Sequence, residues 1–172
     1  MKKTIGIVGG MGPLATCDLF KKIIELTDAS CDQEHVLSLI HILIIDRKAI
    51  NSPVAEKKNL LVAMFQTAYE KYIPTLEEDG VLVIDPGLVT NQTRPIANTF
   101  EVPATQIAVD LGNRMAANMV MLGFLSEALG IIKHQDLLDV VKDTVNPRFV
   151  ELNFKAVEAG AAYAKEHNLY YK

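Results

Sequence analysis

The chain of 172 residues contains only two cysteines, no tryptophan, no long apolar run and no excess of basic residues. The two thiols, Cys17 and Cys31, are too few for a disulfide framework and form no metal-binding motif. Lys and Arg number 17 against 21 Asp and Glu, and they are scattered, which argues against a nucleic-acid surface. The longest apolar run, residues 37–45, is broken by Ser38 and His41 and is too short to cross a membrane. A reduced, cytoplasmic protein is therefore expected.

Apolar periodicity predicts alternating strands and helices. Strands are expected at Thr4–Gly9, Val36–Ile45, Asn59–Met64 and Val81–Asp85, with an edge strand at Phe100–Val102. Helices are expected at Leu14–Thr27, Thr67–Glu78, Pro103–Asp110, Gly112–Leu129, Asp136–Thr144 and Pro147–His167, and a loop at Pro86–Asn98. Pro74 should kink or shorten the last turns of its helix. This alternation predicts one α/β domain over residues 1–172, with a mainly parallel sheet flanked by helices. Because a strand follows Lys3 directly, no signal peptide is expected.

The first predicted strand runs into a glycine-rich segment, Gly9-Gly10-Met11-Gly12-Pro13. Free backbone N–H groups at such a turn, together with the dipole of the following helix, can hold an anion. The candidate anion- or ligand-binding residues are Gly9, Gly10, Met11, Gly12 and Thr16. A tight turn without a ligand would give the same pattern. A dinucleotide-binding fingerprint is not expected, because Pro13 and Leu14 stand where its third glycine would lie.

Few other residues suggest chemistry. Asp85 follows a predicted strand at the end where α/β sheets bind ligands. Its side chain could equally cap the turn Asp85-Pro86-Gly87, which is the interpretation that we favour. His41 is typical of a core or interface position. The remaining histidines are typical of loops or helix surfaces and show no metal-ligand spacing: His35, His134 and His167. No catalytic residue and no metal site are predicted.

The segment Leu111–Gly123 combines methionines with small apolar residues at helical spacing. Such a face lets another helix approach closely, and flexible methionines also suit subunit contacts. The candidate subunit-interface residues are Asn113, Arg114, Met115, Asn118 and Met119. An ordinary core helix remains the alternative interpretation of this face.

Two stretches near the N-terminus, TIGIVGGMGPLATCDLFKKIIELT (Thr4–Thr27) and DQEH (Asp32–His35), resemble the opening of aspartate/glutamate racemases. In that family the glycine loop helps to hold a substrate carboxylate, and two cysteines exchange the α-proton. Cys17 and Cys31 do not occupy matching places, so two-base racemisation is not expected. A racemase-like protein without the cysteine pair, or an inactive α/β domain, are the alternatives to the function considered next.

From about residue 45 to 172 the chain resembles the gamma subunit of 2-oxoacid:ferredoxin oxidoreductases. The segments that carry this resemblance are INSPVAEKKNLLVAMFQTAYEKYIPTL, GVLVIDPGLV, VPATQIAVDLGNRMAANMVMLG and VNPRFVELNFKAVEAG. It implies a non-catalytic subunit that binds no cofactor itself. Partner subunits would carry thiamine diphosphate, Mg2+ and iron–sulfur clusters, and would convert a 2-oxo acid and CoA into acyl-CoA, CO2 and reduced ferredoxin. Pyruvate, branched-chain 2-oxo acids and 2-oxoglutarate all fit the resemblance.

Such gamma subunits normally open with a G-x-G-G-Q-G type loop and later present an Arg-Gly-Gly loop. In this chain the first loop is replaced by Gly9–Pro13 and the second by Cys31–His35. The resemblance therefore implies that the scaffold is kept while the contribution of these loops to catalysis is altered or lost.

Overall fold

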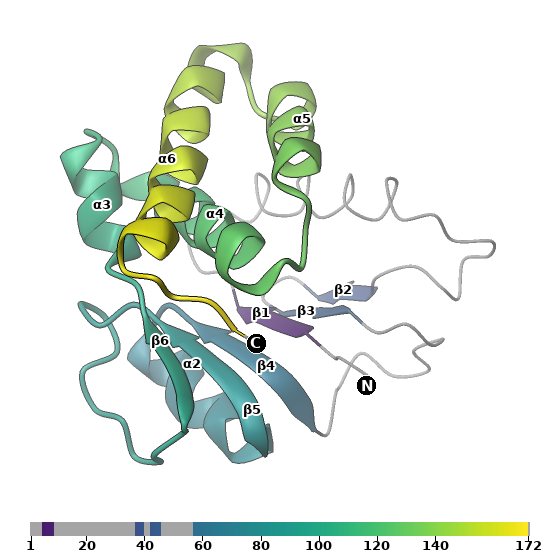
Figure 1. Ribbon diagram of the computed structural model, residues 1–172, viewed down its shortest axis with the longest axis vertical. Helices are drawn as coiled ribbons and strands as arrows, with labels where there is room; N and C mark the ends of the chain where they lie inside the picture. The colour runs from purple at the N-terminus through teal and green to yellow at the C-terminus, as the bar shows by residue number, and fades with distance from the viewer. Residues whose placement is uncertain (1–4, 9–36, 40–41, 46–56, 172) are drawn as a thin grey trace. The chain divides into compact units, whose positions relative to one another are not determined.

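The computed structural model describes residues 5–8, 37–39, 42–45 and 57–171, whose elements are labelled in Figure 1. The chain divides into two compact units, Met1–Glu101 and Val102–Lys172. The first unit contains the sheet, and the regular elements described in the second unit are all helices. Within the described residues, no helix has both the length and the apolar character that crossing a membrane requires.

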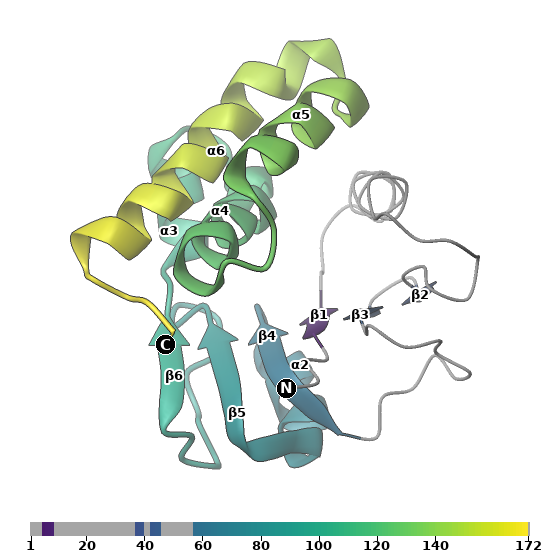
Figure 2. The same cartoon turned by 45° about the vertical axis from the view of Figure 1, so that its right-hand side comes forward.

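The described strands form one sheet in the order β2-β3-β1-β4-β5-β6. Four of them run parallel to one another: β1 (Ile5–Val8), β4 (Lys58–Ala63), β5 (Leu76–Ile84) and β6 (Asn98–Glu101). The other two are antiparallel to their neighbours: β3 (Ile42–Ile45) to β1, and β2 (Leu37–Leu39) to β3. Figure 2 shows β4, β5 and β6 side by side with their arrowheads at the same end. The predictions of an α/β fold and a mainly parallel sheet are confirmed.

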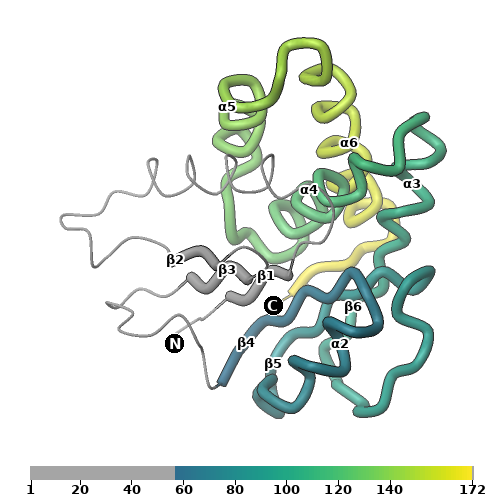
Figure 3. Tube along the Cα trace, turned by 180° about the vertical axis from the view of Figure 1, so that it is seen from behind, coloured from purple at the N-terminus to yellow at the C-terminus, as the bar shows by residue number. Residues whose placement is uncertain are grey.

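The centre of the sheet is continuously apolar. Leu61 and Val62 of β4 and Leu82 and Val83 of β5 are fully buried, and such continuous apolar runs are typical of parallel strands. Helix α2 (Gln66–Tyr72) packs its Tyr69 into a core cluster with residues of both strands. Figure 3 shows α2 beside β4 and β5 from behind. This packing fixes the strand ends from which the candidate site is built.

The predicted helix Thr67–Glu78 is shorter than expected. Helix α2 ends at Tyr72, a 3-10 helix η2 (Ile73–Thr75) contains Pro74, and β5 begins at Leu76. Pro74 shortens the helix as predicted, because its ring clashes with the preceding turn. The extension of the helix to Glu78 was wrong, since those residues belong to β5.

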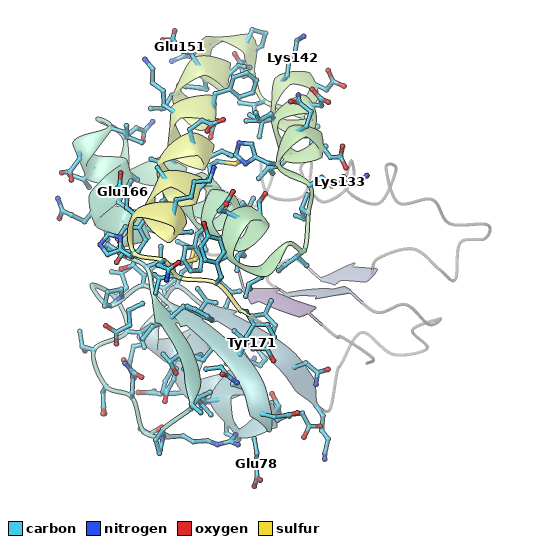
Figure 4. The ribbon with its side chains drawn as sticks, in the orientation of Figure 1. Glu78, Lys133, Lys142, Glu151, Glu166 and Tyr171 are labelled. Carbon is cyan, nitrogen blue, oxygen red and sulfur yellow. The ribbon has the colours of Figure 1, made fainter. Side chains whose placement is uncertain are left out.

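The start of β5 carries an irregularity. Lys58 is paired with Leu76, whereas Leu60 is paired with Val81, so residues 77–80 form an excursion opposite β4. A small residue suits position 80, because a Cβ there would lie 2.7 Å from Cδ1 of Leu76 and 3.0 Å from the carbonyl oxygen of Glu77. Figure 4 shows Glu78 pointing away from the sheet at this end.

The single strand predicted at Val36–Ile45 is two antiparallel strands, β2 and β3. A mostly apolar stretch without glycine or proline does not show where the chain reverses, and antiparallel strands need only a very short connection. His41 falls between them and lies outside the described residues.

The second unit contains helices close to the predicted ones, α3 (Ala104–Asp110), η3 (Arg114–Ala116), α4 (Ala117–Leu129), α5 (His134–Thr144) and α6 (Pro147–Glu166). Two glycines let α4 and α6 approach closely. A Cβ on Gly123 would lie 1.9 Å from the carbonyl oxygen of Val157, and one on Gly160 would lie 1.9 Å from that of Val120. The close approach predicted for the small apolar face of α4 is therefore made by α6 of the same chain.

Candidate functional site

The four parallel strands end in one row. The register pairs Val8 with Ala63, Ala63 with Ile84, and Ile84 with Glu101. Ligands of open α/β sheets bind outside the carboxyl ends of the strands, so this edge is the candidate functional site. The structure describes the residues that follow β4, β5 and β6 in the chain. The glycine segment that follows β1 lies outside the described residues.

Asp85 shapes the turn that follows β5. Its side chain is buried, with 1% of its surface exposed, and its Oδ1 accepts a hydrogen bond of 3.0 Å from the N–H of Gly87. Its carbonyl oxygen also accepts from the N–H groups of Leu88 and Val89, at 3.0 and 2.8 Å. The predicted capping role of Asp85 is therefore confirmed.

Gln66, the first residue of α2, holds the loop that follows this turn. Its N–H donates to the carbonyl of Leu88, and its Oε1 accepts from the N–H groups of Thr90 and Asn91, all at 3.1 Å. Its Nε2 donates to the carbonyl of Asn91 at 2.9 Å and to Oε1 of Glu70 at 3.0 Å. One glutamine thus fixes residues 88–91 beside the strand ends.

A second set of hydrogen bonds holds the same loop at Arg94. The hydroxyl of fully buried Tyr69 accepts from the N–H of Arg94 at 3.1 Å and donates to its carbonyl at 3.4 Å. The Arg94 guanidinium in turn donates to the carbonyls of Ile73 and Leu76, at 3.1 and 2.7 Å. The loop therefore reaches the candidate site in one ordered conformation, which reduces the entropy lost when a partner or ligand binds.

Gln66, Tyr69 and Arg94 were not predicted from the sequence. The position of Gln66 just after an apolar strand was the one available signal. Tyr69 and Arg94 are separated by 25 residues, and no local pattern connects them.

Lys58 is a buried cation at the opposite, amino end of β4. Only 4% of its surface is exposed, and its Nζ donates to Oγ1 of Thr75 at 2.7 Å and lies 5.5 Å from the centre of the Tyr72 ring. The Thr75 hydroxyl donates onward to the carbonyl of Tyr72 at 2.7 Å. Burial lowers the pKa of the Lys58 ammonium below its usual 10.5. Sequence reasoning missed this residue, because a lysine at the start of a strand usually lies at the surface.

The predicted interface residues separate into two groups. Asn113 caps η3 by accepting a 2.9 Å hydrogen bond from the N–H of Met115, and both Arg114 and Met115 are exposed on this turn. Asn118 accepts from the N–H of Met119 at 3.0 Å, and only 2% of the Met119 surface is exposed. The structure therefore brings Asn113, Arg114 and Met115 together at the surface, and Met119 is buried.

The candidate ligand-binding residues Gly9, Gly10, Met11, Gly12 and Thr16 lie outside the described residues, as do Cys17 and Cys31. In the part of the chain that the structure describes, no group of three or more His, Cys, Asp or Glu side chains could hold a metal ion. Nε2 of His134 lies 2.9 Å from Oε1 of Glu158, which links α5 to α6. Exposed His167 contacts the carbonyl of Tyr163, as expected for a helix surface.

Comparison with known proteins identifies related sequences. The family described as pyruvate ferredoxin/flavodoxin oxidoreductase matches residues 29–163. The 2-oxoglutarate synthase subunit KorC of Methanothermobacter thermautotrophicus is 33% identical over 126 residues, which cover 69% of this chain and 66% of that protein. The chain thus spans just under two thirds of the length of this relative.

Solved structures extend the match. A gamma subunit of a keto/oxoacid ferredoxin oxidoreductase from Geobacter sulfurreducens has a TM-score of 0.73 and 25% identity, over 96% of this chain and 98% of that one. The fold also recurs in the 2-oxoglutarate:ferredoxin oxidoreductase of Magnetococcus marinus, solved with 2-oxoglutarate, coenzyme A and succinyl-CoA bound. There the TM-score is 0.71 and the identity 21%, over 96% of this chain but 31% of that longer one.

The family match includes Asp32–His35, whose predicted assignment to a racemase-like part is therefore corrected. It begins at residue 29, so the racemase resemblance of the residues before it stays a prediction. The chain therefore belongs to the pyruvate ferredoxin/flavodoxin oxidoreductase family, as one of its gamma-type subunits.

Proposed function

We propose that this chain is a non-catalytic subunit of a thiamine-diphosphate-dependent 2-oxoacid:ferredoxin oxidoreductase complex in the cytoplasm. The complex converts a 2-oxo acid and CoA into acyl-CoA and CO2 and passes the electrons to ferredoxin. Thiamine diphosphate, Mg2+ and the iron–sulfur clusters belong to the partner subunits. The observation that carries this proposal is the likeness to a separate gamma subunit over nearly the full length of both chains.

The ordered carboxyl edge of the sheet supports a positioning role within such a complex. The loop held by Gln66 and Tyr69 presents a fixed surface directly after the strand ends. The anion-binding role of Gly9–Thr16 belongs to the same proposal, because β1 ends in the same row as β4 and β5. An anionic substrate or cofactor group of the complex is the ligand that suits it.

The relative KorC is a 2-oxoglutarate synthase subunit, and this name favours 2-oxoglutarate as the substrate of the complex. Pyruvate and a branched-chain 2-oxo acid are the comparison substrates. Because this chain supplies no catalytic residue in the proposal, the choice among them depends on the partner subunits.

The test is to purify the complex from the native host through a tag on this chain, and to identify the recovered subunits by mass spectrometry. Reduction of ferredoxin is then measured with 2-oxoglutarate and CoA, with each comparison substrate, and without CoA. We expect CoA-dependent reduction that is fastest with 2-oxoglutarate.

The matched preparation comes from a strain in which the gene for this chain is deleted, with the tag moved to a recovered partner. We expect that it reduces ferredoxin far more slowly and that adding the purified chain restores the rate. Equal rates with and without the chain would contradict the proposal. Exchange of the α-proton of aspartate or glutamate in D2O by the purified chain would instead support the racemase alternative.

A further inference from the structure

The loop that follows β5 contains a short exposed segment between two residues that are packed or held. Residues 90–93 are all exposed. Val89, which precedes them, is 2% exposed and belongs to the same core cluster as Tyr69. Arg94, which follows them, is half-buried. We call residues 90–93 the edge segment.

Both ends of the edge segment are held by hydrogen bonds that are costly to break. The N–H groups of Leu88 and Val89 donate to the carbonyl of Asp85 at 3.0 and 2.8 Å. At the other end, the hydroxyl of Tyr69 accepts from the N–H of Arg94 at 3.1 Å and donates to its carbonyl at 3.4 Å. Because Tyr69 is fully buried, releasing Arg94 would take both of these hydrogen bonds from a buried hydroxyl, which is strongly unfavourable.

The edge segment itself is bound by side chains that water can reach. Oε1 of Gln66 accepts from the N–H groups of Thr90 and Asn91 at 3.1 Å, and its Nε2 donates to the carbonyl of Asn91 at 2.9 Å. Nε2 of Gln92 donates to Oε1 of Glu101, the last residue of β6, at 2.9 Å. These hydrogen bonds connect the edge segment to α2 and to β6. Water can replace them when the segment moves away, because they lie at the surface.

Gln66 keeps a partner when the edge segment leaves it. Its Nε2 also donates to Oε1 of Glu70, one turn along α2, at 3.0 Å. The exposed N–H groups of Thr90 and Asn91 would meet water instead of becoming buried and unpaired. Opening of the edge segment therefore costs less free energy than release of either of its ends.

We propose that the edge segment is a separately opening part of the carboxyl edge: residues 90–93 move away from Gln66 while Val89 and Arg94 stay in place. Ligand-binding loops belong to the least stable parts of a structure, and this edge is where α/β sheets bind ligands. The closed form is the one described above, and the open form is a minor state in equilibrium with it. This opening needs no partner subunit, so it does not rest on the proposed function.

The first experiment measures amide hydrogen exchange in the unchanged, full-length chain, residue by residue, by NMR. We expect the amides of Thr90 and Asn91 to exchange about tenfold faster or more than those of Val89 and Arg94, because only the first two open with the edge segment. Equal protection at all four positions would overturn the proposal, since the loop would then open as one unit.

The second experiment measures 15N order parameters in Gln66→Ala, which removes the side-chain amide and keeps the N–H that donates to the carbonyl of Leu88. We expect the values to fall from about 0.85 to below about 0.6 at residues 90–93 and to stay unchanged at Val89 and Arg94. The melting temperature should stay within a few degrees of that of the unchanged chain. Gln135→Ala is the matched control and should leave the edge segment ordered, because Gln135 also bonds a carboxylate one turn along its helix, at 3.0 Å.

Tyr69→Phe tests the held end of the edge segment. We expect the Arg94 amide to exchange faster and the melting temperature to fall further than in Gln66→Ala, because a bond to a fully buried group is lost. A Tyr69→Phe chain that is as stable as Gln66→Ala would overturn the proposal. So would an edge segment that stays ordered in Gln66→Ala, or a loss of order in that variant that spreads to Val89 and Arg94.

Discussion

At the residue scale, Lys58 joins the start of β4 to the end of η2 through Thr75. An ammonium with little access to water is less favourable than one in the unfolded chain, and its neighbours compensate only in part. Since burial lowers its pKa, the charge of this residue makes the stability of the fold depend on pH.

Replacing Lys58 by methionine should remove that dependence. The unfolded lysine keeps its usual pKa of 10.5, whereas the folded one has a lower pKa. Between the two values the unfolded state binds more protons, so the free energy of unfolding of the unchanged chain rises with pH. We expect the stability of the unchanged chain relative to Lys58→Met to increase from neutral pH toward pH 10.5. Urea unfolding at a series of pH values measures this.

Lys57→Met is the matched control, because it removes one positive charge from a side chain that is 77% exposed. The same pH-dependent difference in both variants would show that the burial of Lys58 is not its cause.

Single residues also show where sequence reasoning works. The capping role of Asp85 could be predicted, because the acid and the N–H that it accepts from are two residues apart. The roles of Gln66 and Lys58 could not be predicted, since their partners lie 25 and 17 residues away and only the folded chain brings them together.

At the scale of elements, the pair α4 and α6 depends on two glycines. A side chain at Gly160 would meet the backbone of α4, with Cβ 1.9 Å from the carbonyl oxygen of Val120 and 2.9 Å from the nitrogen of Phe124. Backbone atoms in the middle of a helix cannot move away as a flexible side chain can. The spacing of the two helices is therefore fixed by the absence of a side chain.

Gly160→Ala should destabilise the chain despite the better helix propensity of alanine. The gain in propensity is at most about 1 kcal/mol, while forcing an extra carbon into a filled contact costs about 1–3 kcal/mol or more. We expect a lower melting temperature and a lower urea midpoint. Ala162→Ser, at an exposed position of α6, should change either quantity little. A Gly160→Ala chain as stable as that control would contradict the close contact of the two helices.

The elements that could be predicted are those whose signals are local. The strands β4 and β5 are marked by continuous apolar runs, α5 and α6 by helical periodicity, and the end of α2 by Pro74. The reversal between β2 and β3 and the early start of β5 could not be predicted, because both depend on pairing with distant strands. The row of strand ends follows from the same long-range register.

At the scale of the whole molecule, the proposal that partner subunits hold the cofactors predicts the metal and thiamine content of the purified chain. The chain purified alone should contain neither iron nor thiamine diphosphate, whereas the complex recovered through it should contain both. Metal analysis by mass spectrometry and chromatographic quantification of thiamine diphosphate measure the two contents.

A double variant, Cys17→Ser with Cys31→Ser, is the control, because these are the two cysteines of the chain. Iron at about one cluster per isolated chain, lost in this variant, would show that the chain itself holds a cluster, contrary to the proposal.

The excursion at residues 77–80 lies at the amino end of β5, and the pairing of Val81–Ile84 with β4 is regular after it. Extra residues placed after Glu78, which points away from the sheet, would lengthen this protrusion without shifting the row in which Ile84 ends. Chain length can therefore vary at one edge of the sheet while the opposite edge keeps its alignment. The protrusion is accordingly a suitable place to insert an epitope tag or fluorescent label into the assembled complex.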